Sequence, residues 1–156
     1  TSLVNKKLLI LLKTKRRQKI LFYYPLEMEV NIVKTLIELR KKNDIYIPFM
    51  VGQSFKMVPF RLPLSRKKFN IYEAGNTNRN IKKIDIAVVP VVGIDGNLQR
   101  VGFGKGMYDR FFQTLQKRPY IIFTQIELCY TKKLICDDYD IACDLMITPK
   151  KIIGKK

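Results

Sequence analysis

Apolar runs and segments of helical periodicity alternate along the whole chain. A short apolar run rich in β-branched residues predicts a buried strand, and apolar residues three or four positions apart predict a helix. The expected strands are 20–24, 45–48, 57–60 (weakened by its proline), 84–92, 120–124 and 145–148. The expected helices are 3–18, a second from Glu29 to about Lys42, and a third from Met107 to before Pro119. Residues 63–80 are polar and rich in turn formers, which predicts a long surface loop.

Strands that alternate with helices predict a mostly parallel sheet with helices on both faces, in three layers α/β/α. In such sheets ligands bind beyond the carboxyl ends of the strands. The 156 residues suit one domain, and neither a repeat nor a linker divides them. We therefore expect a single domain over residues 1–156. Because Thr1 rather than methionine comes first, we also expect the amino-terminal segment to be incomplete.

A glycine-rich segment follows the apolar strand expected at 84–92. It places three glycines at every second position around one lysine, in the run Gly102-Phe103-Gly104-Lys105-Gly106. Glycines lack a Cβ, so the backbone can turn sharply and approach a ligand closely. A helix beginning near Gly106 would direct free N–H groups into this loop, and Lys105 and Arg100 would add positive charge. The segment therefore predicts a phosphate cradle.

The segment differs from the two best-known phosphate-binding motifs. A Walker A loop requires Ser or Thr directly after its lysine, whereas Gly106 follows Lys105. A dinucleotide fingerprint spaces its third glycine one position later. A short glycine-rich turn is by itself weak evidence. The neighbouring Arg100, Tyr108, Asp109 and Arg110 are what favour a site over a simple tight turn.

Composition narrows the choice of chemistry. The formal charge of +17 is compatible with nucleic-acid binding. However, the basic residues are spread from end to end, so we favour a lysine-rich surface on a protein that handles small anions. The chain has no histidine, which excludes histidine-dependent nucleophilic catalysis and histidine metal sites. Three widely spaced cysteines fit neither a zinc motif nor a disulfide framework. The longest apolar run is too short to span a bilayer, and we expect a cytoplasmic protein.

The run from Arg100 to Arg110, Arg-Val-Gly-Phe-Gly-Lys-Gly-Met-Tyr-Asp-Arg, closely resembles the signature of the 5-formyltetrahydrofolate cyclo-ligase family. Other stretches agree with that family in order and spacing: Val89-Pro90, Asp95-Gly96, Glu29-Val30, Ile47-Pro48, Met57, Gln125 and residues 140–144. The resemblance covers nearly all of the chain from about Tyr23. It implies a fold similar to ribose-5-phosphate isomerase and the CoA transferases.

The family resemblance implies an activity. Members convert 5-formyltetrahydrofolate and MgATP to 5,10-methenyltetrahydrofolate, ADP and phosphate, through phosphorylation of the formyl oxygen and attack by N10 of the folate. The implied cofactors are ATP and Mg²⁺, and the expected partner is the folate alone, with no nucleic acid, no membrane and a monomeric chain. Such chemistry needs positioning and charge neutralisation more than a covalent catalyst.

The resemblance also assigns roles to residues of this chain. The implied catalytic residues are Arg100, Lys105 and Tyr108. The implied nucleotide-binding residues are Arg100, Val101, Gly102, Phe103, Gly104, Lys105, Gly106, Met107 and Tyr108. The implied folate-binding residues are Glu29, Met57 and Phe103, with Gln125 a weaker candidate. The implied magnesium ligands are Asp109 and Asp140.

Each assignment has a structural alternative. Asp109 could serve as a first-turn helix carboxylate that favours the dipole, and Asp140 could be one more acid in a solvated loop. Glu29 could be a helix-start acid, with Glu27 as another register, and Met57 and Phe103 could be core residues. Tyr108 could anchor its helix through the Phe111/Phe112 face.

Two departures from the family pattern leave functions other than the enzyme open. Met107 stands where the family usually has a tyrosine, and the family's basic Lys-x-x-Leu-Arg helix has no counterpart here. Either the start of the chain is missing or the phosphate clamp is incomplete. The alternatives to the enzyme are therefore a nucleotide-binding relative without activity and a basic nucleic-acid-binding module.

Overall fold

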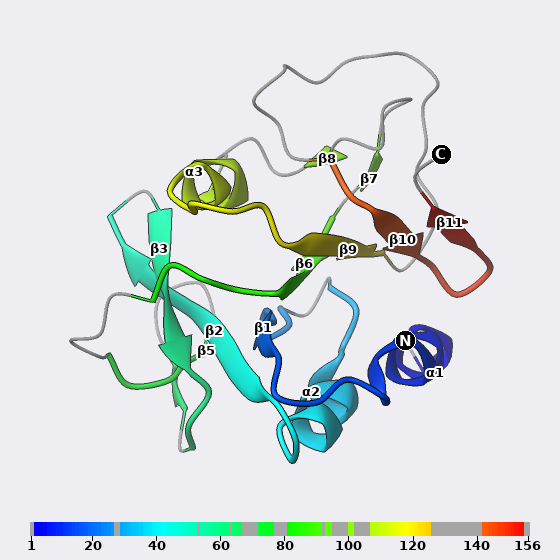
Figure 1. Cartoon of the computed structure of the whole chain (residues 1–156), viewed down its shortest axis with the longest axis horizontal. Coiled ribbons are helices and arrows are strands. Elements are labelled where there is room, and N and C mark those ends of the chain that lie inside the picture. Colours follow the sequence, from blue (N-terminus) through cyan, green and yellow to red (C-terminus); the bar gives the residue numbers. More distant parts are fainter. Residues whose placement is uncertain are drawn as a thin grey trace.

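A seven-stranded sheet forms the centre of the computed structural model (Figure 1). The structure describes residues 2–26, 29–52, 54–62, 64–66, 72–76, 81–91, 93–94, 100–101, 107–125 and 142–154. The strands of the sheet are β1 (Lys19–Leu21), β2 (Asp44–Val51), β3 (Ser54–Pro59), β6 (Ile86–Pro90), β9 (Tyr120–Thr124), β10 (Leu145–Ile147) and β11 (Ile152–Gly154). Their spatial order is β11-β10-β9-β6-β1-β2-β3.

The inner strands of this sheet are parallel, as predicted. β1 pairs in parallel with both β2 and β6, β6 with β9, and β9 with β10. The two edges differ, because β3 runs antiparallel to β2 and β11 antiparallel to β10. Two antiparallel pairs lie apart from the sheet: β4 (Ser65–Arg66) with β5 (Tyr72–Glu73), and β7 (Gly93–Ile94) with β8 (Arg100–Val101).

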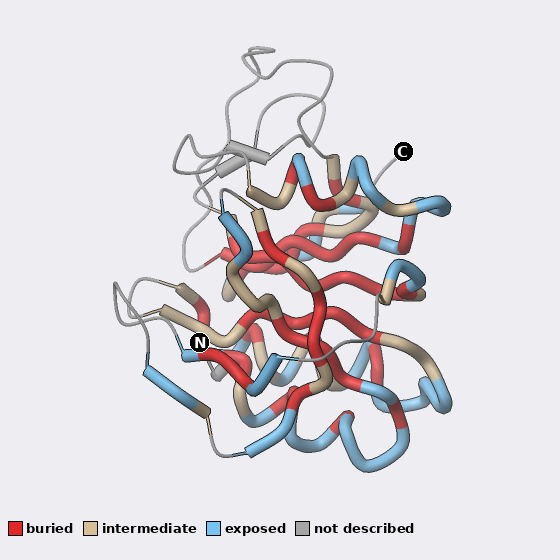
Figure 2. Tube along the Cα trace, turned by 90° about the vertical axis from the view of Figure 1, so that its left-hand side faces the viewer, coloured by how far each residue is buried: buried red, intermediate tan, exposed pale blue. Residues whose placement is uncertain are grey.

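Helices lie on both faces of the sheet (Figure 1). The helices α1 (Ser2–Leu12) and α2 (Val33–Leu39) pack on one face, and α3 (Met107–Gln113) packs on the other. Successive strand residues point to opposite faces, so the core divides into two clusters, and the buried segments run through the middle of the molecule (Figure 2). The α1/α2 cluster includes Leu8, Leu36, Ile20, Ile45, Ile86 and Ile122. The α3 cluster includes Phe111, Leu21, Tyr46, Ala87, Ile121 and Phe123.

All three predicted helices are shorter than expected at their carboxyl ends, and α2 ends at Leu39 instead of about Lys42. α1 ends at Leu12 instead of residue 18, and the chain leaves it through a turn in which Arg17 adopts the left-handed conformation, with φ of 55°. α3 ends at Gln113, well before Pro119. There the Thr114 hydroxyl donates a hydrogen bond to the Phe111 carbonyl, over 2.7 Å. Such local bonds compete with the helical ladder and favour its end.

The second helix begins later than predicted. α2 starts at Val33 instead of Glu29, and the Asn31 side chain accepts a hydrogen bond from the Val33 amide over 3.2 Å. Asn31 thus supplies a side-chain acceptor near the helix start. Glu29 lies in the loop between β1 and α2.

The strand predictions were mostly correct, but five short strands escaped them: β4, β5, β7, β8 and β11. β9 has the predicted limits, and β11 was not predicted. Residues 63–80, expected as a surface loop, contain β4 and β5, and Glu73 and Ala74 there are buried. The Glu73 carboxylate accepts a hydrogen bond from the Met50 amide over 2.6 Å, which ties this segment to β2. Among the helices described, none is long and apolar enough to span a membrane.

Candidate active site

Polar residues from strands far apart in the chain meet at the carboxyl edge of the sheet. Tyr23 lies two residues beyond β1, Thr124 ends β9, and Thr148 follows β10. Backbone hydrogen bonds hold these ends in register: the Val91 amide donates to the Thr124 carbonyl over 3.1 Å, and the Gln125 amide to the Ile147 carbonyl over 3.1 Å. This is the edge at which parallel α/β sheets bind ligands.

The hydroxyl of Tyr23 joins three segments at this edge. It donates a hydrogen bond to the Val30 carbonyl over 2.8 Å and lies 2.7 Å from the Thr124 hydroxyl. A carbonyl can only accept, so the tyrosine proton goes to Val30 and the threonine hydroxyl donates to the tyrosine oxygen. Tyr23 and Thr124 are 2% and 1% exposed. The bonds therefore connect β1, the loop before α2 and β9 in an interior where unmade bonds are costly.

Two of the predicted site residues affect the pKa of the Tyr23 hydroxyl. Burial raises the pKa of Tyr23 well above its ordinary value of 10.0, and the hydrogen bond from Thr124 partly opposes that rise. The charges of Glu29 and Tyr108 act in the same direction as burial and raise the pKa of Tyr23 further. Glu29, predicted to bind folate, and Tyr108, from the glycine–lysine signature, thus both act electrostatically on one buried hydroxyl.

Glu29 forms part of a tight turn. Its carboxylate oxygen Oε1 accepts a hydrogen bond from the Leu26 amide over 2.8 Å, and its own amide donates to the Leu26 carbonyl over 3.0 Å. The side chain is half-buried. This turn is part of the loop that Tyr23 fastens through the carbonyl of Val30.

α3 is fastened to the sheet through aromatic contacts with β3. The rings of Phe111 and Phe55 stack with centroids 4.3 Å apart, and Tyr108 meets Phe55 edge-on at 5.1 Å. Met57 of β3 is fully buried in the same cluster. Met57 is therefore a core residue, as the structural alternative proposed. Its contact with a pterin remains a prediction.

Asp109 lies in the first turn of α3 and is 7% exposed. Buried carboxylates are uncommon unless they are hydrogen-bonded or paired. Within the described residues, no group of three or more histidine, cysteine, aspartate or glutamate side chains gathers to form a metal site. Magnesium commonly takes only one or two protein carboxylates and completes its shell with phosphate oxygens and water, so Asp109 fits that chemistry.

The remaining predicted residues cannot be compared with the structure. Gly102 to Gly106, including Phe103 and Lys105, and Asp140 lie outside the described residues. Arg100 and Val101 are described through their backbone, as strand β8. β8 and α3 therefore bracket the predicted phosphate loop. Gln125, the weaker candidate, is 5% exposed directly after β9.

Sequence reasoning missed two contributors to this edge. Tyr23 was interpreted as a strand residue feeding the core, and Thr124 was not singled out. The available signal was a hydroxyl-bearing residue at the carboxyl end of the expected strands 20–24, 120–124 and 145–148. Lys7 of α1 also reaches this edge, where its ammonium group donates hydrogen bonds to the carbonyls of Thr148 and Pro149 over 3.0 and 2.8 Å.

Comparisons with known proteins agree with the resemblance noted in the sequence. A 5-formyltetrahydrofolate cyclo-ligase from Mycoplasma pneumoniae is 28% identical over 148 residues, which cover 92% of this chain and 81% of that protein. The corresponding protein of Mycoplasma genitalium is 29% identical over 147 residues, with the same coverage. A probable 5-formyltetrahydrofolate cyclo-ligase from Schizosaccharomyces pombe is 24% identical, over 89% of this chain and 78% of that protein.

Solved structures give the same result for the fold. The solution structure of a 5,10-methenyltetrahydrofolate synthetase from Aquifex aeolicus superposes with a TM-score of 0.80 at 25% identity, and covers 98% of this chain and 79% of that one. A 5,10-methenyltetrahydrofolate synthetase from Mycoplasma pneumoniae gives a TM-score of 0.65 at 24% identity, over 94% and 82% of the two chains. The sequence profile of the 5-formyltetrahydrofolate cyclo-ligase family matches residues 1–149. The chain belongs to the 5-formyltetrahydrofolate cyclo-ligase family.

Proposed function

We propose that this chain converts 5-formyltetrahydrofolate and MgATP to 5,10-methenyltetrahydrofolate, ADP and phosphate. The observation that carries the proposal is the hydrogen-bonded carboxyl edge of the sheet, where the Tyr23 hydroxyl joins the loop that carries Glu29 to the end of β9. Glu29 and Tyr108, the latter from the helix that follows the glycine–lysine segment, both raise the pKa of this hydroxyl. A folate-binding carboxylate and a nucleotide-binding segment at one sheet edge are what a reaction between these two substrates requires.

The proposed reaction begins with the nucleotide. ATP transfers its terminal phosphoryl group to the formyl oxygen, which makes that oxygen a good leaving group. N10 of the folate then forms a bond to the activated carbon, and the carbon–oxygen bond breaks with release of phosphate. The protein contributes charge and position, because the phosphoryl-transfer transition state is loose and spreads negative charge over several oxygens.

Residues of the signature would supply that charge. Lys105 and Arg100 provide cations for the phosphates, and the amides of the glycine segment provide fixed donors. Asp109 and Asp140 are the proposed carboxylate ligands of Mg²⁺, which neutralises phosphate charge when it is bound. The Tyr108 hydroxyl is the proposed contact to the transferring group, and its ring packs edge-on against Phe55.

The folate half of the site would be formed by the loop after β1. The Glu29 carboxylate is the proposed acceptor for the pterin N–H groups. Phe103 is proposed to present apolar surface to the ring. Met57 would act from within the core, by supporting Phe55 and α3.

The test is a spectrophotometric assay for the methenyl product. We expect purified protein to form it from 5-formyltetrahydrofolate only when both ATP and Mg²⁺ are present, with one ADP released per product. Omission of ATP, and replacement of Mg²⁺ by a chelator, are the controls. Stoichiometric nucleotide binding without product would instead support the inactive relative, and product formation without ATP would contradict the proposed reaction.

A further inference from the structure

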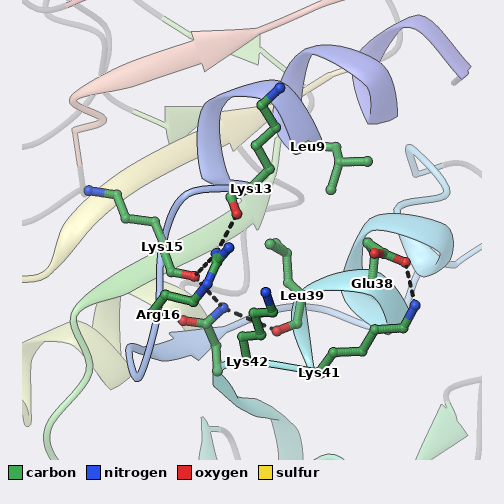
Figure 3. Close-up of a pocket in the computed structure, with 9 residues that line it drawn as sticks. Leu9, Lys13, Lys15, Arg16, Glu38, Leu39, Lys41 and Lys42 are labelled. Atoms are coloured by element: carbon green, nitrogen blue, oxygen red, sulfur yellow. Dashed lines mark hydrogen bonds and ion pairs between the residues drawn. The ribbon is translucent and has the colours of Figure 1, made fainter.

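A basic cleft lies at the amino ends of the parallel strands, whereas the candidate active site lies at their carboxyl ends. It is a pocket of about 110 Å³ between the end of α1, the turn that follows it and the end of α2 (Figure 3). Its cations are Lys13, Lys15, Arg16, Lys41 and Lys42. The turn after α1 leads into the start of β1, and the end of α2 leads into the start of β2, so the cleft lies at the amino ends of these parallel strands.

The two walls of the basic cleft are held together by a buried asparagine. The Asn43 amide nitrogen donates to the carbonyls of Lys15 and Leu39 over 3.0 and 3.1 Å, and its Oδ1 accepts from the Gln18 amide over 3.0 Å. The Arg17 amide donates to the Lys42 carbonyl over 2.7 Å. Asn43 is only 9% exposed. Two like-charged segments are therefore fixed side by side despite their mutual repulsion.

Most of the positive charge in the cleft has no acidic partner. Glu38 is the one carboxylate in its lining, and it pairs with Lys41 over 2.9 Å. Arg16 donates to the carbonyls of Lys13 and Lys15, over 2.6 and 3.0 Å. Within the described part of the chain, the side chains of Lys13, Lys15 and Lys42 make no hydrogen bond or ion pair. Figure 3 shows Lys13 and Lys15 on the α1 side of the cleft and Lys42 on the α2 side.

Stabilisation of the helix ends accounts for only part of this charge. Lysine and arginine are favourable near helix carboxyl ends, and each end carries the equivalent of about half a negative charge. The ends of α1 and α2 together therefore offset about one of the positive charges. After Glu38 is counted as well, a surplus of about three charges remains.

The size and lining of the cleft favour phosphates over a nucleobase. A cavity needs roughly 10–15 Å³ to hold one water, so about 110 Å³ accommodates a group of several heavy atoms. The lining has no aromatic side chain on which a base could stack. Two linked phosphates carry about three negative charges near neutral pH, which matches the surplus.

We propose that the basic cleft binds an oligophosphate anion, meaning two or three linked phosphates, either free or at the end of a nucleotide. This site is separate from the candidate active site and does not rest on the proposed function. Lysine side chains are long and flexible, so ammonium groups on both walls can turn toward one anion.

Calorimetric titration with tripolyphosphate tests the proposal. The cleft variant carries Lys13→Ala, Lys15→Ala and Lys42→Ala. The control variant carries Lys117→Ala, Lys150→Ala and Lys151→Ala, which removes the same charge from exposed positions outside the cleft. We expect the cleft variant to bind tripolyphosphate about tenfold more weakly, and the control to bind like the original chain. Equal weakening in both variants would overturn the proposal, because net charge alone would then explain binding.

Further arms identify the source of the phosphates. The binding that the cleft variant loses is the binding assigned to the cleft. If pyrophosphate and ADP have similar affinities for it, the cleft recognises phosphates alone. Tighter ADP binding would indicate a nucleotide, and either result supports the site. A single-stranded oligonucleotide that binds the cleft more tightly than tripolyphosphate would overturn the proposal in favour of nucleic acid. The methenyl assay on the cleft variant should be unchanged, and a loss of rate would contradict the separation of the two sites.

Discussion

At the scale of single residues, Tyr23 does more than fill the core. Its hydroxyl fixes the loop that carries Glu29 against the end of β9, through Val30 and Thr124. Removal of the hydroxyl leaves a buried carbonyl without its donor, which typically costs about 1–3 kcal/mol. The loop would then sample more positions, and with it the Glu29 carboxylate that is proposed to bind folate.

Tyr23→Phe should therefore lower the free energy of unfolding by about 1–3 kcal/mol and raise KM for 5-formyltetrahydrofolate more than it lowers kcat. Tyr72→Phe is the matched control, since Tyr72 is 39% exposed and should tolerate the change. Urea denaturation and steady-state kinetics provide the measurements. A variant with lowered stability but an unchanged KM would limit Tyr23 to a structural role.

Lys105 carries the sharpest prediction about catalysis. If it neutralises charge on the transferring phosphoryl group, Lys105→Ala should lower kcat by about 10²–10³-fold, the range seen when one preorganised donor is removed. The fold should be unaffected, as judged by circular dichroism and thermal unfolding. Lys117→Ala serves as control at an exposed position. Full activity in the Lys105 variant would remove this residue from the mechanism.

Cys143 makes stability depend on pH. It is fully buried, and burial raises the pKa of its thiol from 9.0 to about 12. Between these values the unfolded chain loses the thiol proton while the folded chain keeps it. The contribution of this buried thiol to the free energy of unfolding is thus complete below pH 9. It is lost as pH rises toward 12, by about 1.4 kcal/mol per pH unit. Urea denaturation at pH 8 to 11 should show this loss in the original chain. Cys143→Ala should lack this loss of stability with pH. If both proteins lose stability equally between pH 8 and 11, Cys143 is not the cause.

At the scale of elements, the docking of α3 on β3 connects the core to the candidate active site. Phe55 contacts both Phe111 and Tyr108, so one ring supports the helix that follows the glycine segment. The orientation of the signature residues should depend on this ring more than on other aromatic residues of similar burial.

Phe55→Ala and Phe60→Ala separate that dependence from general stability. Both rings are buried, 6% and 7% exposed, but Phe60 packs in the cluster on the α1/α2 face. Each change should cost about 3–5 kcal/mol. Only the Phe55 variant should also raise KM for ATP, measured below its melting temperature. Equal kinetic effects would show that loss of stability alone disturbs the site.

The local sequence pattern predicted the helices and inner strands better than it predicted the edge strands and the contacts between distant residues. β9 was bounded correctly because an apolar run follows Pro119, and the parallel core followed from strands alternating with helices. β11 was missed because Ile152–Gly154 is too short to show a period, and its antiparallel direction depends on pairing with β10. The start of α2 was placed at Glu29 because Asn31 as a local acceptor was overlooked. Tyr23 and Thr124 are 101 positions apart, so their contact has no local signature.

At the scale of the whole molecule, the balance of charge sets how the fold responds to salt. The chain has 30 lysines and arginines against 13 acidic residues. In the described regions, the recorded ion pairs are Lys41 with Glu38 and Arg118 with Asp144. A net charge this far from zero destabilises the compact state through self-repulsion, and salt screens that repulsion beyond about 10 Å at 0.1 M.

The melting temperature should therefore rise as sodium chloride is increased from about 0.02 to 0.5 M, a range that shortens the screening length severalfold. A gain of about 1 kcal/mol would appear as a rise of roughly 2–4 °C for a chain of this size. The comparison variant carries Lys82→Glu, Lys83→Glu and Lys150→Glu, all at exposed positions, and each replacement exchanges a positive for a negative charge. It should melt higher at low salt and respond less to added salt. If both proteins responded equally, specific ion binding rather than self-repulsion would govern the effect.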